Sequence, residues 1–401
     1  MIYEHEYALT DLSIVILNHE RYPHLKRLLN YYNTYGLEMN IVVLDSSIDK
    51  SVDDELRELL NKENITWKKY DNGNFYEKIA NGIQCIKTKY SVLCPVDDFI
   101  VPSAFFKCIE FIEKHHNYLC AQGLFIKHWL FEKDGNTEFG WMPRDIRMAS
   151  NNFKLPQNRV YAYLSNLSGG HQFYGVHRTE LFKLIWKETA HYTPNIGWGE
   201  YFPGCLSLIY GKRKILPVFY LSRETHDPLP LSKENLNLDF IRNLLIARDG
   251  LAKHFAIKNN VKHHIAQEQA NWVILAKLRI KIAPKSFVSA IKRIRYMFYI
   301  NILTENLKLS LIGGGVFTAL NRIIVFAIRS FIGIFPSTAK NKLLSNLENR
   351  SIQIVRSIYK GILLRKTSAF KDDFFSIKHA VLKANIDTNV ASKSRSEYTV
   401  T

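Results

Sequence analysis

The segment YSVLCPVDDFIVP, from Tyr90 to Pro102, is the part of the sequence on which our fold prediction mainly depends. Its first five residues, Tyr90 to Cys94, form an apolar run rich in strand formers, which predicts a buried strand. Pro95 interrupts regular pairing because proline has no N–H to donate to a neighbouring strand. Asp97 and Asp98 follow at once, so two carboxylates stand side by side where the predicted strand ends.

Two interpretations fit this acidic pair. Adjacent carboxylates repel each other, and removing them from water is costly unless a cation or a hydrogen-bond donor lies nearby. A divalent ion that bridges a diphosphate prefers such oxygen ligands. Alternatively, the pair caps a helix, since acids are favoured before a helix start and Ser103 to Glu113 has a helical pattern. Taken by itself, the pair favours neither interpretation.

The residues before this stretch alternate between strand and helix patterns. Apolar runs predict strands at Leu12 to Leu17, Ile41 to Leu44 and Ile65 to Tyr70. The segments that follow these runs carry apolar residues at helical spacing, as in Leu25, Leu28 and Leu29. Such alternation predicts βαβ units, and therefore a mostly parallel sheet with helices on its faces.

Polar residues occupy the ends of three of these predicted strands. In an open parallel sheet, ligands bind outside the carboxyl ends of the strands. The residues Asn18 to Arg21, Asp45 and the acidic pair all occupy such ends, so we expect them to share one crevice. The chain contains no GxGxxG and no GxxxxGK[ST] pattern, which argues against a dinucleotide dehydrogenase and against a P-loop enzyme.

A second candidate site is the sequence Gly197-Trp198-Gly199-Glu200. Glycine on both sides of Trp198 lets the backbone approach a ligand closely. The indole ring of Trp198 offers a surface on which a sugar acceptor can stack, and Glu200 is a candidate general base. The alternative is a surface turn that carries an incidental acid.

Residues 11–227 resemble the GT-A glycosyltransferases, in particular the bacterial family-2-like group that uses nucleotide sugars. The resemblance rests on the order of five segments, which are LSIVILNHERYPHLKRLL, IVVLDSS, KIANGIQCIKTKYSVLCPVDDFIVP, FYGVHRTELF and GWGE…LSLIYGK…LPVFYLSRETH. It implies a GT-A, Rossmann-like sheet that is mixed but mostly parallel, flanked by helices and followed by a mainly α-helical region.

The same resemblance implies roles for individual residues. Four residues would contact the nucleotide, namely Asn18, Glu20, Arg21 and Asp45. On the diphosphate, Asp98 would bind a divalent metal ion (Mg²⁺ or Mn²⁺), with Asp97 supporting it or touching the ribose. His226 would be a further metal ligand and Arg223 a diphosphate contact, while Glu200 would deprotonate the acceptor in an inverting transfer. The family often has Asp-x-Asp where this chain has Val96-Asp97-Asp98, so the division of roles between the two acids stays open.

The chain carries an excess of positive charge, with 54 Lys and Arg against 37 Asp and Glu and a formal net charge of +17. Such an excess predicts phosphate-bearing partners, either nucleic acid or an anionic membrane. From Gln269 to Thr304 there is no acid, and basic residues alternate with apolar ones, which is typical of a helix on an anionic bilayer. The uncharged run from Leu309 to Asn321 is shorter than the roughly 20 residues of a spanning helix. A soluble helical bundle, or a dimer interface, is the alternative.

These observations predict three segments. We expect a GT-A domain over residues 1–230, a basic helical region over 231–384 that binds a membrane or a second copy, and a disordered tail over 385–401. Five cysteines without a CxxC pair favour a reducing compartment, and the N-terminus shows no signal-peptide pattern. We therefore expect a cytoplasmic protein, peripheral at the inner face of the cytoplasmic membrane.

The predicted function is transfer of a sugar from a nucleotide donor to a hydroxyl of a surface glycan, such as capsule or lipopolysaccharide, or of a lipid-linked acceptor. A nucleotidyltransferase is less favoured because its glycine-rich first loop is missing from LNHER. A nucleic-acid-binding protein is suggested by charge alone, and no helix-turn-helix, zinc or RRM signature supports it, so we expect no nucleic-acid partner. A catalytically inactive GT-A-like scaffold is the remaining alternative.

Overall fold

The structure, a computed structural model, describes residues 10–35, 39–48, 52–71, 74–144, 150–165, 172–193, 196–225, 238–282 and 370–397. Its strands are β1 (Leu12–Asn18), β2 (Asn40–Asp45), β3 (Ile65–Lys69), β4 (Tyr90–Pro95), β5 (Phe99–Ile100), β6 (Tyr118–Lys133), β7 (Asn136–Arg144), β8 (Val176–Arg178) and β9 (Lys212–Glu224). Its α-helices are α2 (Tyr22–Asn33), α3 (Asp54–Leu60), α4 (Phe75–Gly82), α5 (Pro102–Lys114), α6 (Pro156–Leu164), α7 (Thr179–Tyr192), α8 (Ile196–Gly199), α9 (Phe202–Tyr210), α10 (Leu238–Asn259), α11 (His263–Ile282) and α15 (Lys371–Glu397).

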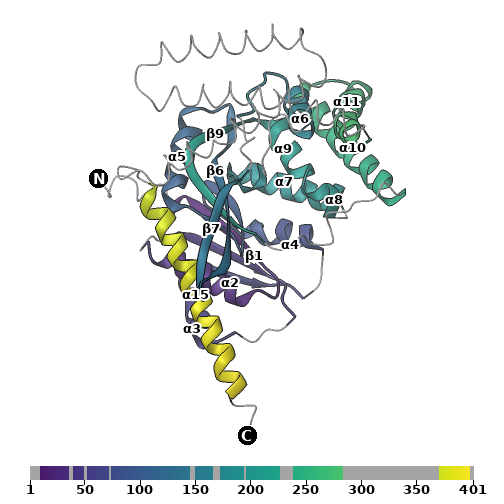
Figure 1. The fold of residues 1–401 in the computed structure, drawn as a ribbon. Helices are drawn as coiled ribbons and strands as arrows, with labels where there is room; N and C mark the ends of the chain where they lie inside the picture. The colour runs from purple at the N-terminus through teal and green to yellow at the C-terminus, as the bar shows by residue number, and fades with distance from the viewer. Residues whose placement is uncertain are drawn as a thin grey trace, which may run out of the picture.

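The strands of the described part form one nine-stranded mixed sheet in the order β3-β2-β1-β4-β8-β6-β9-β5, with β7 paired to β6. The strands β3, β2, β1 and β4 run parallel to one another, as their alternation with helices predicts. Helices flank the sheet, and a helical group lies at one end of the molecule (Figure 1). The predicted α/β class, a mixed sheet followed by a helical region, is confirmed.

Register in the parallel part brings the strand ends level. Asn18 at the end of β1 lies opposite Asp45 at the end of β2, and Leu17 lies opposite Pro95 of β4. All residues of β2 from Ile41 to Asp45 are buried, as the continuous apolar run predicts for a strand covered on both faces. The polar residues that follow these strands therefore emerge along one edge of the sheet.

The acidic pair lies in the turn between β4 and β5. The next helix, α5, starts only at Pro102, and its N-cap residue Val101 makes no side-chain capping hydrogen bond. Asp97 and Asp98 are therefore not helix caps, and that interpretation of the pair is wrong.

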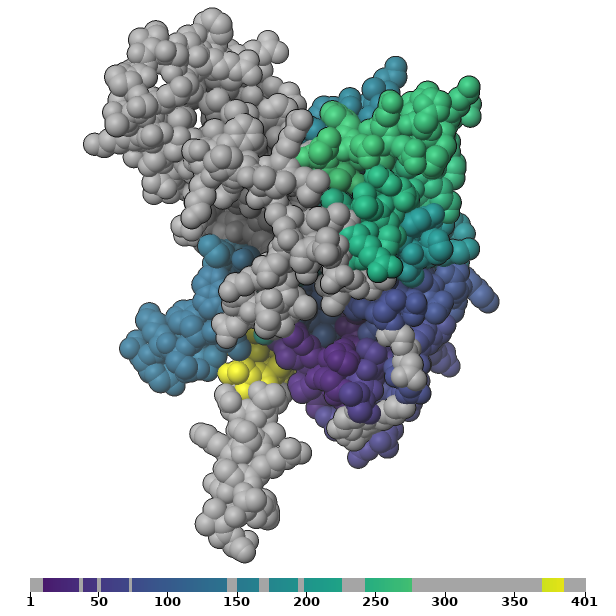
Figure 2. Space-filling view, turned by 90° about the vertical axis from the view of Figure 1, so that its right-hand side faces the viewer, coloured from purple at the N-terminus to yellow at the C-terminus, as the bar shows by residue number. Residues whose placement is uncertain are grey.

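The first hydrophobic core joins the sheet to the distant helix α15. Phe374, Ile377 and Val381 of α15 are buried in the same cluster as β1, β2 and β4. The ring of Phe374 lies 5.3 Å from that of Trp141 and 6.3 Å from that of Phe219. In Figure 2 the yellow part of α15 lies against the purple N-terminal segments.

The second hydrophobic core is made of helices on both sides of the predicted boundary at residue 230. It joins residues of α6 and α9, such as Leu164 and Phe202, to residues of α10 and α11, such as Phe255 and Val273. Polar contacts follow the same pattern, because Glu188 of α7 accepts hydrogen bonds from His254 and Lys253 of α10, each at 2.9 Å. The described helices after residue 230 therefore share a hydrophobic core with helices that precede it.

Helix α15 extends into the predicted C-terminal tail. The expected disordered tail begins at residue 385, whereas α15 continues as a helix through Glu397. Its buried residues Phe374, Ile377 and Val381 recur at helical spacing and anchor the helix, and the helix continues beyond them. Residues 283–369, with most of the basic region, lie outside the described residues. No helix that the structure describes combines the length and the apolar character that a membrane span requires.

Candidate functional site

The loops after β1 and β2 are joined by the side chain of Asn18. Its amide nitrogen donates to Asp45 Oδ1 at 2.9 Å and to Ser47 Oγ at 3.1 Å. Asn18 is fully buried and Asp45 is 2% exposed. The predicted meeting of these two residues at the sheet edge is therefore present in the structure.

Asp45 is a buried carboxylate that is held by neutral donors. Tyr22 Oη donates to Oδ2 at 2.9 Å, Trp67 Nε1 donates to Oδ2 at 3.3 Å, and Ser47 Oγ donates to Oδ1 at 2.6 Å. Burial raises the pKa of Asp45, but the hydrogen bonds from Ser47, Asn18 and Tyr22 outweigh it, so the pKa lies below its ordinary value. The group is thus an anion at neutral pH.

Lys78 of α4 lies beside this network and is a residue that sequence reasoning missed. It is 6% exposed, and Nζ donates to the backbone oxygen of Asn18 at 3.1 Å and to Ser46 Oγ at 2.7 Å. Burial lowers the pKa of Lys78 to about 8, against a smaller opposing effect of Asp45. Among the described residues no carboxylate lies within ion-pair distance of Lys78, so a buried ammonium group faces the strand ends with Asp45 as a more distant anion.

The sequence feature that could have pointed to the burial of Lys78 is Gly82, four residues later on the same helix. A Cβ atom at Gly82 would lie 2.4 Å from Leu44 Cδ1, so glycine is needed for the close approach of α4 to β2. This approach brings that face of α4, with Lys78 one turn earlier, close to the end of β2. A lysine inside an otherwise apolar helix pattern does not show this by itself.

The loop Glu20-Arg21 links both sides of the crevice. Glu20 has a left-handed backbone (φ 53°), its N–H donates to Ser47 Oγ at 2.8 Å, and its carboxylate accepts from the N–H of Ile48. Arg21 points towards the loop after β4, where its Nη1 lies 2.6 Å from Asp97 Oδ2. Glu20 thus orders the loop after β2, and its nucleotide contact stays a prediction.

Each acid of the pair is matched by an arginine. Asp98 is 1% exposed, and its Oδ2 accepts from Arg223 Nε at 2.8 Å while its Oδ1 accepts from the backbone N–H of Glu224 at 3.1 Å. Asp97 is more open, with 17% of its side chain exposed. Arg223 therefore lies beside the acidic pair, and its contact with the diphosphate stays a prediction.

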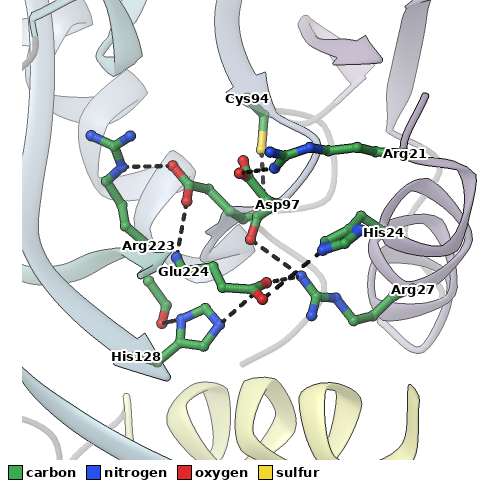
Figure 3. Close-up of polar contacts among 10 residues, drawn as sticks. Arg21, His24, Arg27, Cys94, Asp97, His128, Arg223 and Glu224 are labelled. Atoms are coloured by element: carbon green, nitrogen blue, oxygen red, sulfur yellow. Dashed lines mark hydrogen bonds and ion pairs between the residues drawn. The ribbon is translucent and has the colours of Figure 1, made fainter. Parts of the chain in front are cut away.

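A third carboxylate, Glu224, continues this charged cluster, as Figure 3 shows. It pairs with Arg27 at 2.5 Å, and Arg27 also donates to the backbone oxygen of Asp97 at 3.3 Å. His24 and His128 each place Nε2 3.9 Å from the carboxylate of Glu224. Burial raises the pKa of Glu224, but Arg27 and the histidines outweigh it, so the carboxylate is ionised at neutral pH.

The arrangement of these acids does not fit the predicted metal site. Both oxygens of Asp98 are engaged by Arg223 and a backbone N–H, and Asp97 is paired with Arg21. Among the residues that the structure describes, no group of three or more His, Cys, Asp or Glu is suited to holding a metal ion. His226, the other predicted ligand, lies outside the described residues. Arginine side chains occupy the positions beside the carboxylates where a cation would bind.

The Gly-Trp-Gly-Glu segment is arranged differently from its prediction. Trp198 is 3% exposed, packs in the second hydrophobic core and contacts Tyr201 edge to face at 5.9 Å, so its role as a stacking surface has no support in the structure. A Cβ atom at Gly199 would lie 1.7 Å from the hydroxyl oxygen of Tyr76. Glycine is therefore required there by a neighbouring tyrosine rather than by a ligand.

Glu200 is exposed. The pKa of Tyr174 is raised by burial first and then, against the opposing effect of Arg223, by Asp98, Asp97 and Glu200. The Arg223 guanidinium lies 5.1 Å from the centre of the Tyr174 ring. The acidic pair and the candidate base thus both raise the pKa of this buried tyrosine.

No protein-family profile and no curated protein sequence matches this chain. Solved structures similar to it include those of S. aureus TarS. The match to the TarS 1-349 structure spans 87% of this chain and 90% of the TarS chain, with 12% sequence identity and a TM-score of 0.43. A complex of TarS 1-349 with UDP-GlcNAc has 13% identity, a TM-score of 0.44 and the same coverage. A longer TarS structure has 14% identity and a TM-score of 0.44, and this chain covers 55% of it.

Proposed function

We propose that this protein is a GT-A type glycosyltransferase that uses a nucleotide-sugar donor. The observation that carries the proposal is the meeting of Asp45, the acidic pair and buried cations at the carboxyl ends of β1, β2 and β4. Ligands bind at this edge in open α/β sheets. Carboxylates accept hydrogen bonds from sugar hydroxyls, and ammonium and guanidinium groups bind phosphates.

The two sides of the crevice suit different parts of such a donor. On the β1–β2 side, the ionised Asp45 and the ammonium of Lys78 lie close together and suit the nucleoside and its first phosphate. On the β4–β9 side, Arg21 and Arg223 suit the diphosphate. Arg21 is 35% exposed, so it can exchange its contact with Asp97 for one with a phosphate oxygen.

The proposed transfer step is an in-line displacement. The acceptor hydroxyl oxygen attacks the anomeric carbon, the bond from that carbon to the diphosphate oxygen breaks, and the nucleoside diphosphate leaves with the electron pair. Glu200 accepts the hydroxyl proton, and the configuration at the anomeric carbon is inverted. Arginine side chains stabilise the charge on the leaving group.

The acceptor and location are part of the proposal. A hydroxyl of a surface glycan or of a lipid-linked precursor is the proposed nucleophile, and the net charge of +17 supports a position at an anionic membrane surface. A protein that binds a nucleotide sugar without transferring it is the second candidate, because the acidic pair is engaged by arginines.

The test is the thermal stability of the purified chain with a panel of nucleoside diphosphates, each with and without Mn²⁺. A ligand at a hundred times its dissociation constant adds about 2.7 kcal/mol. We expect stabilisation by one nucleotide, weakened in Lys78→Met and kept in the exposed control Lys107→Met. Release of that nucleotide from its sugar then distinguishes the enzyme from the binding protein. If no nucleotide stabilises the chain, the proposal fails. Comparison of the samples with and without Mn²⁺ shows whether this ion contributes to nucleotide binding.

A further inference from the structure

A groove of about 1050 Å³ lies between α2 and α15. One wall is the face of α2 that carries His24 and Arg27, and the opposite wall is the face of α15 that carries Phe375 and His379. Glu224, at the end of β9, also lines it. This volume is at the upper end of that of small-molecule pockets, and it suffices for several sugar rings.

The groove adjoins the candidate donor site through three of its lining residues. Tyr22 donates to Asp45 at 2.9 Å, and Arg27 donates to the backbone oxygen of Asp97 at 3.3 Å. Glu224 donates its N–H to Asp98 at 3.1 Å. In Figure 3 the yellow helix α15 passes beside Glu224, Arg27 and His128. A chain bound in the groove therefore lies next to the acidic pair.

The charges of the lining are largely paired and do not favour an anion. Lys26 lies 3.0 Å from Asp53 and 2.8 Å from Glu55, and Arg27 is paired with Glu224. With histidine neutral, the lining has three cations against four carboxylates, namely Lys26, Arg27 and Lys383 against Asp53, Glu55, Glu224 and Asp372. An anionic polymer would meet a slightly negative surface, whereas a neutral chain would meet none of this repulsion.

The remaining lining groups match the chemistry of a sugar. Phe375 is 45% exposed although its neighbour Phe374 is buried in the core. Around it, Asn30, Ser376 and His379 offer hydrogen-bonding groups. A sugar ring has an apolar C–H face and a rim of hydroxyls, so an open aromatic ring among polar side chains complements both.

We propose that this groove binds the acceptor of the transfer reaction, and that the acceptor is a neutral, hydroxyl-rich chain. The inference rests on the proposed function, which supplies the donor on the other side of the acidic pair. It makes α15 a wall of the acceptor site and assigns Phe375 as a residue that stacks on the acceptor.

The experiment is saturation-transfer NMR of the full chain with maltohexaose and chitohexaose as neutral probes and hexagalacturonate as an anionic probe. We expect signals from at least one neutral probe and none from the anionic one. Phe375→Ala is expected to weaken neutral binding about tenfold, as for the loss of one stacking contact. The matched control is Phe153→Ala, which removes a ring that is 44% exposed and lies outside the groove.

Three results would overturn the inference: no signal from either neutral probe, equal binding by Phe375→Ala and the wild type, or preference for hexagalacturonate. Nucleoside diphosphate stabilisation measured in the same samples separates the two proposals. Nucleotide binding without oligosaccharide binding would contradict the acceptor role of the groove and leave the proposed function standing. Oligosaccharide binding without nucleotide binding contradicts the proposed function and the acceptor role, and leaves a carbohydrate-binding groove.

Discussion

Asp45 and Asp98 are both buried carboxylates at the edge of the same sheet, yet the protein stabilises them by different means. Asp45 is held by hydroxyl, amide and indole donors and keeps its negative charge uncompensated at hydrogen-bond distance. Asp98 is held by the guanidinium of Arg223 and one backbone N–H, which makes its surroundings neutral. On one side of the crevice a carboxylate is therefore held by neutral donors, and on the other side the carboxylates are paired with arginine side chains.

The largest effect is expected from removing the arginine-paired acid. Asp98→Ala leaves Arg223 charged, mostly buried and without its carboxylate, and we expect a loss of about 3–5 kcal/mol in the free energy of unfolding. Urea denaturation measures it. The double variant Asp98→Ala/Arg223→Met is expected to recover part of this loss, because no uncompensated charge remains. A double variant less stable than the single one would contradict the role of the pair.

Lys78 gives the next largest effect, and it appears as a pH dependence. Its pKa is lowered to about 8 in the folded chain from an ordinary 10.5, so its charge disfavours folding below pH 8 and this penalty disappears as pH rises towards 10.5. Relative to Lys78→Met, the wild type should gain about 3 kcal/mol of unfolding free energy between pH 7 and pH 10.5. Parallel stability curves for the two proteins would show that Lys78 is not perturbed.

Replacing Asp45 tests the side held by neutral donors. Asp45→Ala removes the acceptor of several buried donors without stranding a paired cation, so we expect a smaller loss, about 1–3 kcal/mol at pH 7. Because its folded pKa is lowered, the contribution of Asp45 is fully present above its unfolded pKa of about 3.9 and is lost as pH falls below that value. Chemical denaturation at pH 7 and at pH 3 should therefore show a difference between wild type and variant that narrows in acid.

Arg21 should give the smallest change in stability. It is 35% exposed and its partner Asp97 is 17% exposed, so solvent screens the pair, and Arg21→Gln is expected to cost about 0–1 kcal/mol. The same variant should weaken nucleoside diphosphate binding in the thermal-shift assay. An Arg21 variant that loses several kcal/mol but binds nucleotide normally would show that Arg21 stabilises the fold and does not contact the nucleotide.

The sequence was sufficient to predict the parallel strands and the residues at their ends. Leu12 to Leu17, Ile41 to Leu44 and Tyr90 to Cys94 are continuous apolar runs, and their order along the chain determines which ends meet. Asn18 and Asp45 follow directly from this rule. Such features depend on local pattern and on a topological rule, both of which one sequence contains.

Features that depend on distant partners were not predictable in this way. The pairing of Asp98 with Arg223 joins residues 125 positions apart, so the partner of this acid could not be read from its own segment. Trp198 has the local pattern of a binding loop, but residues of α9 and α10 cover it. The burial of Lys78 follows from the close approach of α4 to β2, which only the assembled structure shows.

The attachment of α15 to the sheet has a consequence for synthesis of the protein. Tyr35 donates to Asp373 across 338 residues of sequence, and the ring of Phe374 covers Trp141 and Phe139. Ribosomes extend a chain by about 5–20 residues per second. Phe374 is therefore synthesised roughly 10 to 50 s after Phe139 and Trp141, and these two rings lack their contact with it during that time. A chain that stops short of α15 exposes this apolar surface permanently.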